Sequence, residues 1–331
     1  MKRRTFFHTF LSAGLGVPAA RLIGSSRDFP AGMNGRNRPE TGVVVMVLGT
    51  AQDGGIPHIG CRCVNCARAE KDPRFVRRIA SLAILDFEEE KVFLVDATPD
   101  IRSQTVAVMD RIRFAPFGKT FVPHGVLLTH AHIGHYTGLM FYGYEGQAAR
   151  NIPVYCSERM AAFLKENGPW SQLVRQENIR VHPIQPAQTI SLTRQVVVQG
   201  FSVPHRDEFT DTLGFCIRGR KKALLYIPDI QSWESWGRSL QEELGKVQLA
   251  LLDGTFYSPE DLPSRNLKAI GHPFIQDTMA LLKSQPPQGR PLVYFTHLNH
   301  THPALDPDGR ARKAIEEMGF SLGEDGMEFR I

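Results

Sequence analysis

Three histidines, His130, His132 and His135, stand close together directly after the apolar run of residues 126–128. Neutral imidazole is a good ligand for zinc, iron and manganese. A loop at the end of a buried strand can direct several imidazoles at one point, because the strand fixes where the loop begins. The spacing therefore predicts a metal site built on these three histidines.

A second cluster consists of three cysteines, Cys61, Cys63 and Cys66. They pair poorly with one another, since a disulfide needs Cα atoms about 4.4–6.8 Å apart and suitably directed Cβ atoms. Three thiolates in one tight loop suit a structural, tetrahedral Zn²⁺, which needs a fourth ligand from elsewhere. Free thiols are the alternative. Cys156 and Cys216 lie in strand-like runs, where we expect buried, small apolar side chains.

The histidine cluster resembles the H-x-H-x-D-H signature of the metallo-β-lactamase superfamily, whose fold is an αββα sandwich. Further residues match that family in chain order, each after an apolar run: Asp96, His205, Asp229 and His297. The resemblance implies that Asp96 braces the histidine loop and that Asp229 bridges two metals.

The resemblance also implies a ligand set for each of the two active-site metals. The ligands of the first metal are three histidines and one aspartate: His130, His132, His205 and Asp229. Those of the second metal are two histidines and the shared aspartate: His135, His297 and Asp229.

Gly134 departs from the family pattern, because it stands where the signature has its own aspartate and offers no ligand atom. The second metal is therefore expected to bind more weakly than the first, and Gly134→Asp is expected to raise its occupancy. Asp53 is a candidate replacement, since the relatives place its loop beside the site. The ligand types suit one or two Zn²⁺, Mn²⁺ or Fe²⁺ ions. Single-metal or iron-dependent oxidative chemistry stays open beside two-metal hydrolysis.

Residues 42–331 also resemble two narrower relatives, the phosphodiesterase of the carbon–phosphorus lyase pathway and pyrroloquinoline-quinone biosynthesis protein B. The matching segments are residues 49–66, 296–300 and 325–328. The phosphodiesterase holds a structural zinc with its cysteines and a histidine three residues after the last metal ligand, which implies His300 as the fourth zinc ligand. It also implies that His272 protonates the leaving group; a capping or supporting role for His272 stays open.

The elements that must position these side chains are predicted from apolar patterning. Strands are predicted at residues 43–48, 81–87, 91–97, 126–128, 152–156, 179–184, 195–203, 213–218, 223–227, 248–252 and 292–296. Helices are predicted at residues 100–112, 136–149, 157–166, 233–245, 276–284 and 309–318. Short strands separated by helices, with polar motifs in the loops after strands, indicate a layered α+β sandwich. We expect residues 42–331 to form a single domain.

Residues 1–26 are predicted to be an export signal. A pair of arginines at positions 3–4 precedes two phenylalanines and a short, weakly apolar stretch, which resembles a twin-arginine signal. Residues 27–41 are predicted to be a linker. The expected location is the periplasm or another extracytoplasmic compartment, with the twin-arginine export machinery as a partner. A disordered basic terminus is the alternative.

The chain has 331 residues, of which 42% are hydrophobic and 22% charged, so it can form a packed core. No apolar run approaches ~18 residues, so no stable membrane span is expected. The net charge is +5, and residues 1–26 carry four of these positive charges and no acid. The nearly neutral remainder is unlike the basic face of a nucleic-acid binder, so no nucleic-acid partner is expected.

These features together predict an exported metal-dependent hydrolase that cuts a phosphodiester or another ester in a small-molecule substrate. The metal would lower the pKa of bound water toward ~7 and so provide a hydroxide nucleophile. One alternative is an iron-dependent oxidative or cofactor-biosynthesis role like that of pyrroloquinoline-quinone biosynthesis protein B. Another is a non-catalytic zinc-binding protein. The sequence leaves the substrate open, and the oligomeric state open between a monomer and a homodimer.

Overall fold

The structure is a computed structural model and describes residues 41–112, 114, 120–261, 271–283 and 290–331. Glu40–Ile331 forms one compact unit. The predicted signal, residues 1–26, and residues 27–40 of the predicted linker lie outside the described residues. Among the helices of the described ranges, none is both long enough and apolar enough to cross a membrane.

One sheet contains the first strand of the unit and, beside it, the last. Within the described residues it has seven strands, in the order β14 (Glu328–Arg330), β1 (Val43–Gly49), β2 (Ser81–Asp86), β3 (Lys91–Val95), β4 (Gly125–Leu127), β5 (Ile152–Cys156) and β6 (Ile179–Pro183). Strand β1 pairs antiparallel with both β14 and β2, while β3 to β6 are parallel neighbours.

The other sheet is built by the second half of the chain. The part of the chain that the structure describes contributes seven strands to it, in the order β13 (Ser321–Leu322), β12 (Leu292–Thr296), β11 (Leu249–Asp253), β10 (Ala223–Ile227), β9 (Thr212–Arg218), β8 (Val197–Val203) and β7 (Thr189–Ser191). Neighbouring strands from β10 to β13 pair in parallel, whereas neighbouring strands from β7 to β10 pair antiparallel.

The two sheets pack face to face, as the alternation along β1 shows. Val43, Val45 and Val47 belong to one buried cluster together with Phe215 of β9 and Tyr226 of β10, so this cluster fills the space between the sheets. The intervening β1 residues instead join a cluster with helices on the outer face of the first sheet. Because both faces of these strands are buried, the sequence of each strand is a continuous apolar run.

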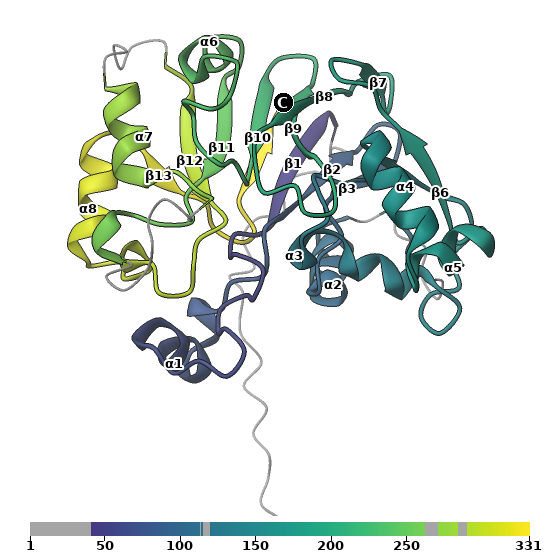
Figure 1. Ribbon diagram of the computed structural model, residues 1–331, viewed down its shortest axis with the longest axis horizontal. Helices are drawn as coiled ribbons and strands as arrows, with labels where there is room; N and C mark the ends of the chain where they lie inside the picture. Colours follow the sequence, from purple (N-terminus) through teal and green to yellow (C-terminus); the bar gives the residue numbers. More distant parts are fainter. Residues whose placement is uncertain (1–40, 113, 115–119, 262–270, 284–289) are drawn as a thin grey trace, which may run out of the picture. The chain divides into compact units, whose positions relative to one another are not determined.

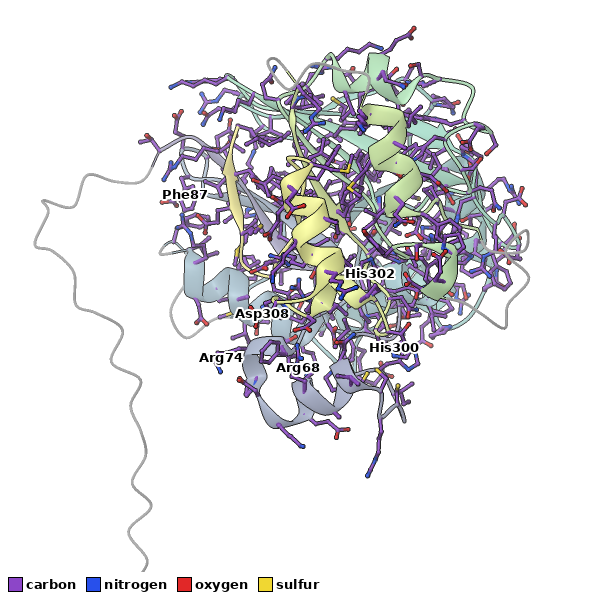
Figure 2. The ribbon with its side chains drawn as sticks, turned by 90° about the vertical axis from the view of Figure 1, so that its left-hand side faces the viewer. Arg68, Arg74, Phe87, His300, His302 and Asp308 are labelled. Atoms are coloured by element: carbon purple, nitrogen blue, oxygen red, sulfur yellow. The ribbon has the colours of Figure 1, made fainter. Side chains whose placement is uncertain are left out.

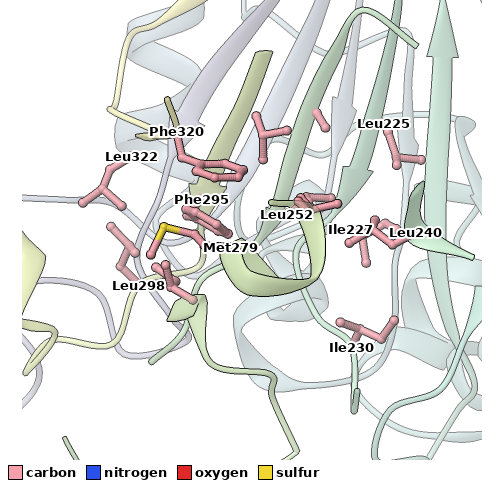
Figure 3. Close-up of a cluster of buried hydrophobic side chains, with 14 of the residues drawn as sticks. Leu225, Ile227, Ile230, Leu240, Leu252, Met279, Phe295, Leu298, Phe320 and Leu322 are labelled. Carbon is pink, nitrogen blue, oxygen red and sulfur yellow. The ribbon is translucent and has the colours of Figure 1, made fainter. Parts of the chain in front are cut away.

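Helices cover the outer face of each sheet (Figure 1). Those against the first sheet are α2 (Ile101–Arg111), α4 (Glu158–Glu166) and α5 (Trp170–Arg175). Those against the second sheet are α6 (Leu240–Leu244), α7 (Ile275–Leu282) and α8 (Arg310–Glu317). In this second outer layer Met279 of α7 lies against Phe295 of β12 (Figure 3). The architecture is therefore the αββα sandwich predicted from the sequence.

Further helical elements lie in the loops that connect these strands and helices. They are α1 (Val64–Lys71), α3 (Ile133–Tyr136) and the 3-10 turns η1 (Pro73–Phe75), η2 (Thr137–Tyr142), η3 (Pro259–Asp261) and η5 (Pro303–Leu305).

Two predicted helices are wrong in extent. The segment predicted as a helix over 136–149 begins as α3 and η2 but is irregular after Tyr142. Its backbone is tightly folded there, since a Cβ on Gly146 would lie 2.1 Å from the carbonyl oxygen of Phe141. The helix predicted at 233–245 is confined to α6. Trp233 instead lies in a loop, where its indole donates to Thr278 Oγ1 at 2.8 Å.

Candidate metal centres

Strand ends bring the predicted metal-binding residues together. The loop of His130, His132 and His135 follows β4, and β8, β10 and β12 end shortly before the other candidate ligands. His297 comes directly after β12 with φ of 61°, a left-handed conformation that few non-glycine residues adopt. Asp96 is in the same conformation directly after β3, with φ of 67°. Such backbone strain is typical of sites whose geometry is fixed by the surrounding structure.

His130, His132 and His205 form the first group of metal-binding atoms, and these atoms lie within 4.8 Å of one another. Nε2 of His130 is 2.9 Å from Nδ1 of His132. Nε2 of His205 is 3.7 Å from Oδ1 of Asp229. Burial lowers the pKa of His205 to about 4 and that of His130 well below its ordinary value. Both rings are therefore neutral at pH 7, with a nitrogen lone pair available to a cation.

His135 and His297 form a second group around the other oxygen of the same aspartate. Nε2 of His135 is 3.2 Å and Nε2 of His297 is 3.3 Å from Oδ2 of Asp229. Burial alone would lower the pKa of His135, but Asp96 on one side and Asp229 on the other raise it well above its ordinary value. This negative field at His135 also favours a divalent cation. Asp229 therefore presents one oxygen to each group, as a bridging ligand would.

Asp53 completes the second group at the position that Gly134 leaves open. Its Oδ1 lies 3.6 Å from Nε2 of His135 and accepts a hydrogen bond from the Gly134 backbone N–H at 3.1 Å. The carboxylate, His135 and His297 offer ligand atoms within 4.8 Å of one another. A Cβ on Gly134 would lie 2.1 Å from Asp53 Oδ1, so an aspartate does not fit at position 134 while Asp53 is in place.

A carboxylate and a threonine orient the histidines of the first sheet. Thr129 donates to Asp96 through its backbone N–H at 2.8 Å and through its hydroxyl at 3.0 Å. The Nδ1 atoms of His130 and His135 lie 2.9 Å from Thr129 Oγ1 and 2.8 Å from Asp96 Oδ2, respectively. Since Thr129 Oγ1 gives its proton to Asp96, it accepts from His130. Both rings then hold a proton on Nδ1, so Nε2 is the nitrogen that they present to a metal.

The second sheet has an equivalent arrangement that the sequence analysis missed. Thr255 Oγ1 donates to Asp253 Oδ1 at 2.8 Å and lies 2.9 Å from Nδ1 of His297. Nδ1 of His272 lies 2.8 Å from Asp253 Oδ2. Asp253 is fully buried at the end of β11. The signal was present in the sequence, because Asp253 ends an apolar run just as Asp96 does.

The residues around these groups fit metal ions. Among the described residues, several buried polar atoms have no hydrogen-bond partner, and five of them converge here: His135 Nε2, His205 Nδ1, His205 Nε2, Asp229 Oδ2 and His297 Nε2. An unpartnered buried polar atom is costly, so a cluster of nitrogen and carboxylate atoms suggests that they bind something together. Imidazole and carboxylate are the ligands of catalytic zinc and of manganese or iron.

The cysteine cluster forms a separate centre with His300. The sulfurs of Cys61, Cys63 and Cys66 lie 3.4, 3.6 and 3.6 Å from Nδ1 of His300. In a tetrahedral site with Zn–S of about 2.3 Å and Zn–N of about 2.1 Å, a sulfur and a nitrogen are ~3.6 Å apart. The four residues therefore have the spacing of a closed structural zinc site. Figure 2 views the molecule from the side that carries His300 and α1.

This centre joins two loops that also reach the active-site groups. Asn65 donates to the backbone carbonyls of His300 and His302, at 3.1 Å each. The Gln52 backbone N–H donates to the carbonyl of Leu298 at 3.0 Å. Because Asp53 follows Gln52, and Leu298 follows His297, the cysteine centre stabilises the loops that carry both side chains. The five cysteines, including buried Cys156 and Cys216, are free of disulfides.

The fold and the metal-binding groups together define a class of protein. Residues 91–298 match the family model described as the beta-lactamase superfamily domain. The chain belongs to this superfamily, and the resemblance seen in its motifs is confirmed.

Among curated proteins, the chain is similar to coenzyme PQQ synthesis protein B. It is 27% identical to that of Methylobacterium nodulans over 86% of this chain and 99% of the relative. It is 26% identical to that of Rhodopseudomonas palustris over 87% of this chain and 99% of the relative.

Among solved structures, similar folds include Zn²⁺-bound PqqB from Methylobacterium extorquens, with a TM-score of 0.72 and 23% identity over 87% of this chain and all of that chain. A diphosphatase of the PhnP family has a TM-score of 0.61 and 22% identity over 87% of this chain and 96% of that chain.

Proposed function

We propose that this protein is a metal-dependent hydrolase of a phosphodiester or related ester in a small molecule. The observation that carries the proposal is the position of Asp229, with one carboxylate oxygen toward each histidine group and with His272 nearby. Nδ1 of His272 lies 3.7 Å from Asp229 Oδ1, so a candidate proton donor borders the place where metals would bind. Similarity to a PhnP-family diphosphatase agrees with phosphoester chemistry.

The groups of this chain have distinct roles in such a reaction. His130, His132, His205 and Asp229 would hold one metal, and His135, His297, Asp53 and Asp229 a second. When bound, divalent cations acidify water and stabilise negative charge on the ester oxygens.

His272 donates a proton to the leaving oxygen, with Asp253 holding its Nδ1–H. Burial alone would lower the pKa of His272, but Asp253 and Asp229 raise it above its ordinary value. These carboxylates thus favour the protonated ring, which is the form that a general acid requires.

The test separates proton donation from metal binding by varying the leaving group. His272→Gln should lower kcat about 10²–10⁴-fold for an alkyl phosphodiester, whose leaving alkoxide needs a proton. For bis(p-nitrophenyl) phosphate, whose leaving group is stable as an anion, kcat should change far less. Metal content serves as the control and should match the wild type. Equal losses on both substrates would contradict the role of His272, and an inactive metal-loaded wild type would contradict hydrolysis.

A second candidate function is a role in cofactor biosynthesis like that of coenzyme PQQ synthesis protein B. It is favoured by the similarity to these relatives over nearly their whole length. The two candidates differ in metal and co-substrate. Protein purified with iron that consumes O₂ in the presence of a substrate would favour this role, whereas O₂-independent turnover with zinc or manganese would favour hydrolysis.

Export by the twin-arginine route is part of the proposal and rests on the sequence of residues 1–26. Changing Arg3 and Arg4 together to lysine should retain a reporter fusion in the cytoplasm. A matched Arg21→Lys variant should be exported like the wild type. Normal export of the double variant would reject this route.

A further inference from the structure

A cavity of about 150 Å³ lies between α1 and the C-terminal part of the chain. Four arginines line it, Arg68, Arg74, Arg77 and Arg312, together with a single acidic residue, Glu324. Figure 2 shows Arg68 and Arg74 on the face that also carries His300. None of the residues assigned to a metal lines this cavity, and the proposed function does not use it.

The guanidinium groups are held in place by hydrogen bonds to residues outside the cavity lining and, for Arg68, also by the ring of Phe75, which lines it. Nη1 of Arg68 donates to Asp306 at 3.1 Å, and its guanidinium carbon lies 5.1 Å from the centre of the Phe75 ring. Nη1 of Arg77 donates to Thr50 Oγ1 and to the carbonyl of Gly323.

Arg74 and Arg312 are held in the same way. Asp72 accepts from Arg74, and Glu316 accepts from Nε of Arg312 at 2.6 Å. Each guanidinium is therefore ion-paired, but Asp72, Asp306 and Glu316 do not line the cavity. The hydrogen-bonding groups that face it come from four guanidiniums beside one carboxylate.

Two of these arginines are poorly solvated and share one carboxylate. The side chains of Arg77 and Arg312 are only 15% and 16% exposed. Both share Glu324, whose Oε1 lies 3.7 Å from Arg77 and 2.9 Å from Arg312. Burial lowers the pKa of Arg77, which reflects the cost of keeping this cation away from water. An anion in the cavity would offset that cost.

We propose that this cavity binds a small oxyanion of the phosphate type. Guanidinium groups present paired N–H donors that match the oxygens of phosphate. A cavity of about 150 Å³ is known to hold a molecule the size of benzene, so orthophosphate or sulfate fits and a whole nucleotide does not. Asn65 and Ile56 also line the cavity and belong to the segment that contains the cysteines. A bound anion would therefore link that segment to α8.

The test is calorimetric titration of the metal-loaded protein with inorganic phosphate in an oxyanion-free buffer. Phosphate also binds metal centres, so the titration is repeated in an Asp229→Asn background. In that background Arg68→Gln should weaken phosphate binding at least 10-fold, which corresponds to about 1.4 kcal/mol. The matched control Arg180→Gln changes an exposed arginine that donates to Asn151 and should leave the affinity unchanged. Added NaCl should weaken binding, because the attraction is electrostatic.

Ribose 5-phosphate serves as a second probe to distinguish a free anion from an esterified phosphoryl group. The proposal expects phosphate and sulfate to bind and ribose 5-phosphate to bind more weakly. If ribose 5-phosphate binds with the same affinity as phosphate, and this binding is lost in Arg68→Gln, the cavity binds an esterified phosphoryl group at its mouth and not a free anion. Absence of binding in the Asp229→Asn background, with a folded protein by circular dichroism, would overturn the proposal. The same affinity in Arg68→Gln would also overturn it.

Discussion

Replacing Asp53 tests whether this residue serves as the ligand that Gly134 cannot provide. Asp53→Ala removes the carboxylate whose Oδ1 lies 3.6 Å from Nε2 of His135. Loss of a supporting partner typically weakens metal binding 10–100-fold, so loss of a direct ligand should exceed 100-fold, or about 2.7 kcal/mol. The first metal should be unaffected, because Asp53 belongs to the group of His135 and His297 and not to that of the first metal.

The assay is metal content per chain after equilibration with buffered free zinc or manganese. Wild type should hold two active-site metals besides the structural zinc, and Asp53→Ala should lose one at free-metal concentrations that saturate the wild type. Asp207→Asn is the matched control, since Asp207 is an exposed carboxylate that pairs with Arg159. Equal occupancy in Asp53→Ala and wild type would refute the assignment. A wild type with only one active-site metal would restore the expectation of a weak second site.

Exchange of the two residues gives a stricter version of this test. Gly134→Asp alone should lower second-metal occupancy, opposite to the expectation from the sequence, because the new Cβ would lie 2.1 Å from Asp53 Oδ1. Adding Asp53→Gly removes that clash, so the aspartate that Gly134→Asp introduces into the family signature gains space. A contact of 2.8 Å to the Asp53 Cα remains, so we expect partial recovery. A single Gly134→Asp variant with higher occupancy than wild type would contradict this reasoning.

Three further outcomes are expected. Cys63→Ser should lower the zinc content by one per chain and lower Tm. It should also weaken binding of the second active-site metal, because the same loop carries Asp53. An unchanged zinc content by elemental analysis would contradict the assignment of a structural zinc. Thr255→Val keeps the side-chain shape but removes the hydroxyl that lies 2.9 Å from His297 Nδ1, so the affinity for the second metal should fall about 10–100-fold, as measured by competition with a chelator. An unchanged affinity would show that Thr255 does not orient His297. Burial lowers the pKa of His124, whose Nδ1 accepts the Val92 N–H at 3.2 Å, so the contribution of neutral His124 to stability is present above the unfolded-state pKa of about 6.5 and is lost as pH falls below it. His124→Asn should therefore make stability to urea less dependent on pH between 7 and 5. An unchanged pH profile would contradict this account.

The sequence by itself predicted the fold, and it singled out most of the residues that the structure gathers into candidate metal sites, because these features are encoded locally. A continuous apolar run followed at once by a polar residue marks the end of a buried strand. Candidate ligands such as His130, Asp229 and His297 occur at such ends. The three cysteines needed only their own spacing to indicate zinc. The predicted extents of helices were wrong where tertiary packing determines the backbone conformation, as in the segment after Tyr142, which contains Gly143 and Gly146.

Only the tertiary structure decided which carboxylates and hydroxyls support these ligands. Asp53 precedes Gly134 by many residues and meets it only because the loop after β1 crosses the ends of both sheets. Asp253 and Thr255 become partners of His272 and His297 only when β11 and β12 lie side by side. These contacts depend on sheet order and on loop paths, which residue types and spacing along the chain do not fix. The cationic cavity likewise forms only when α1 packs against the C-terminal part of the chain.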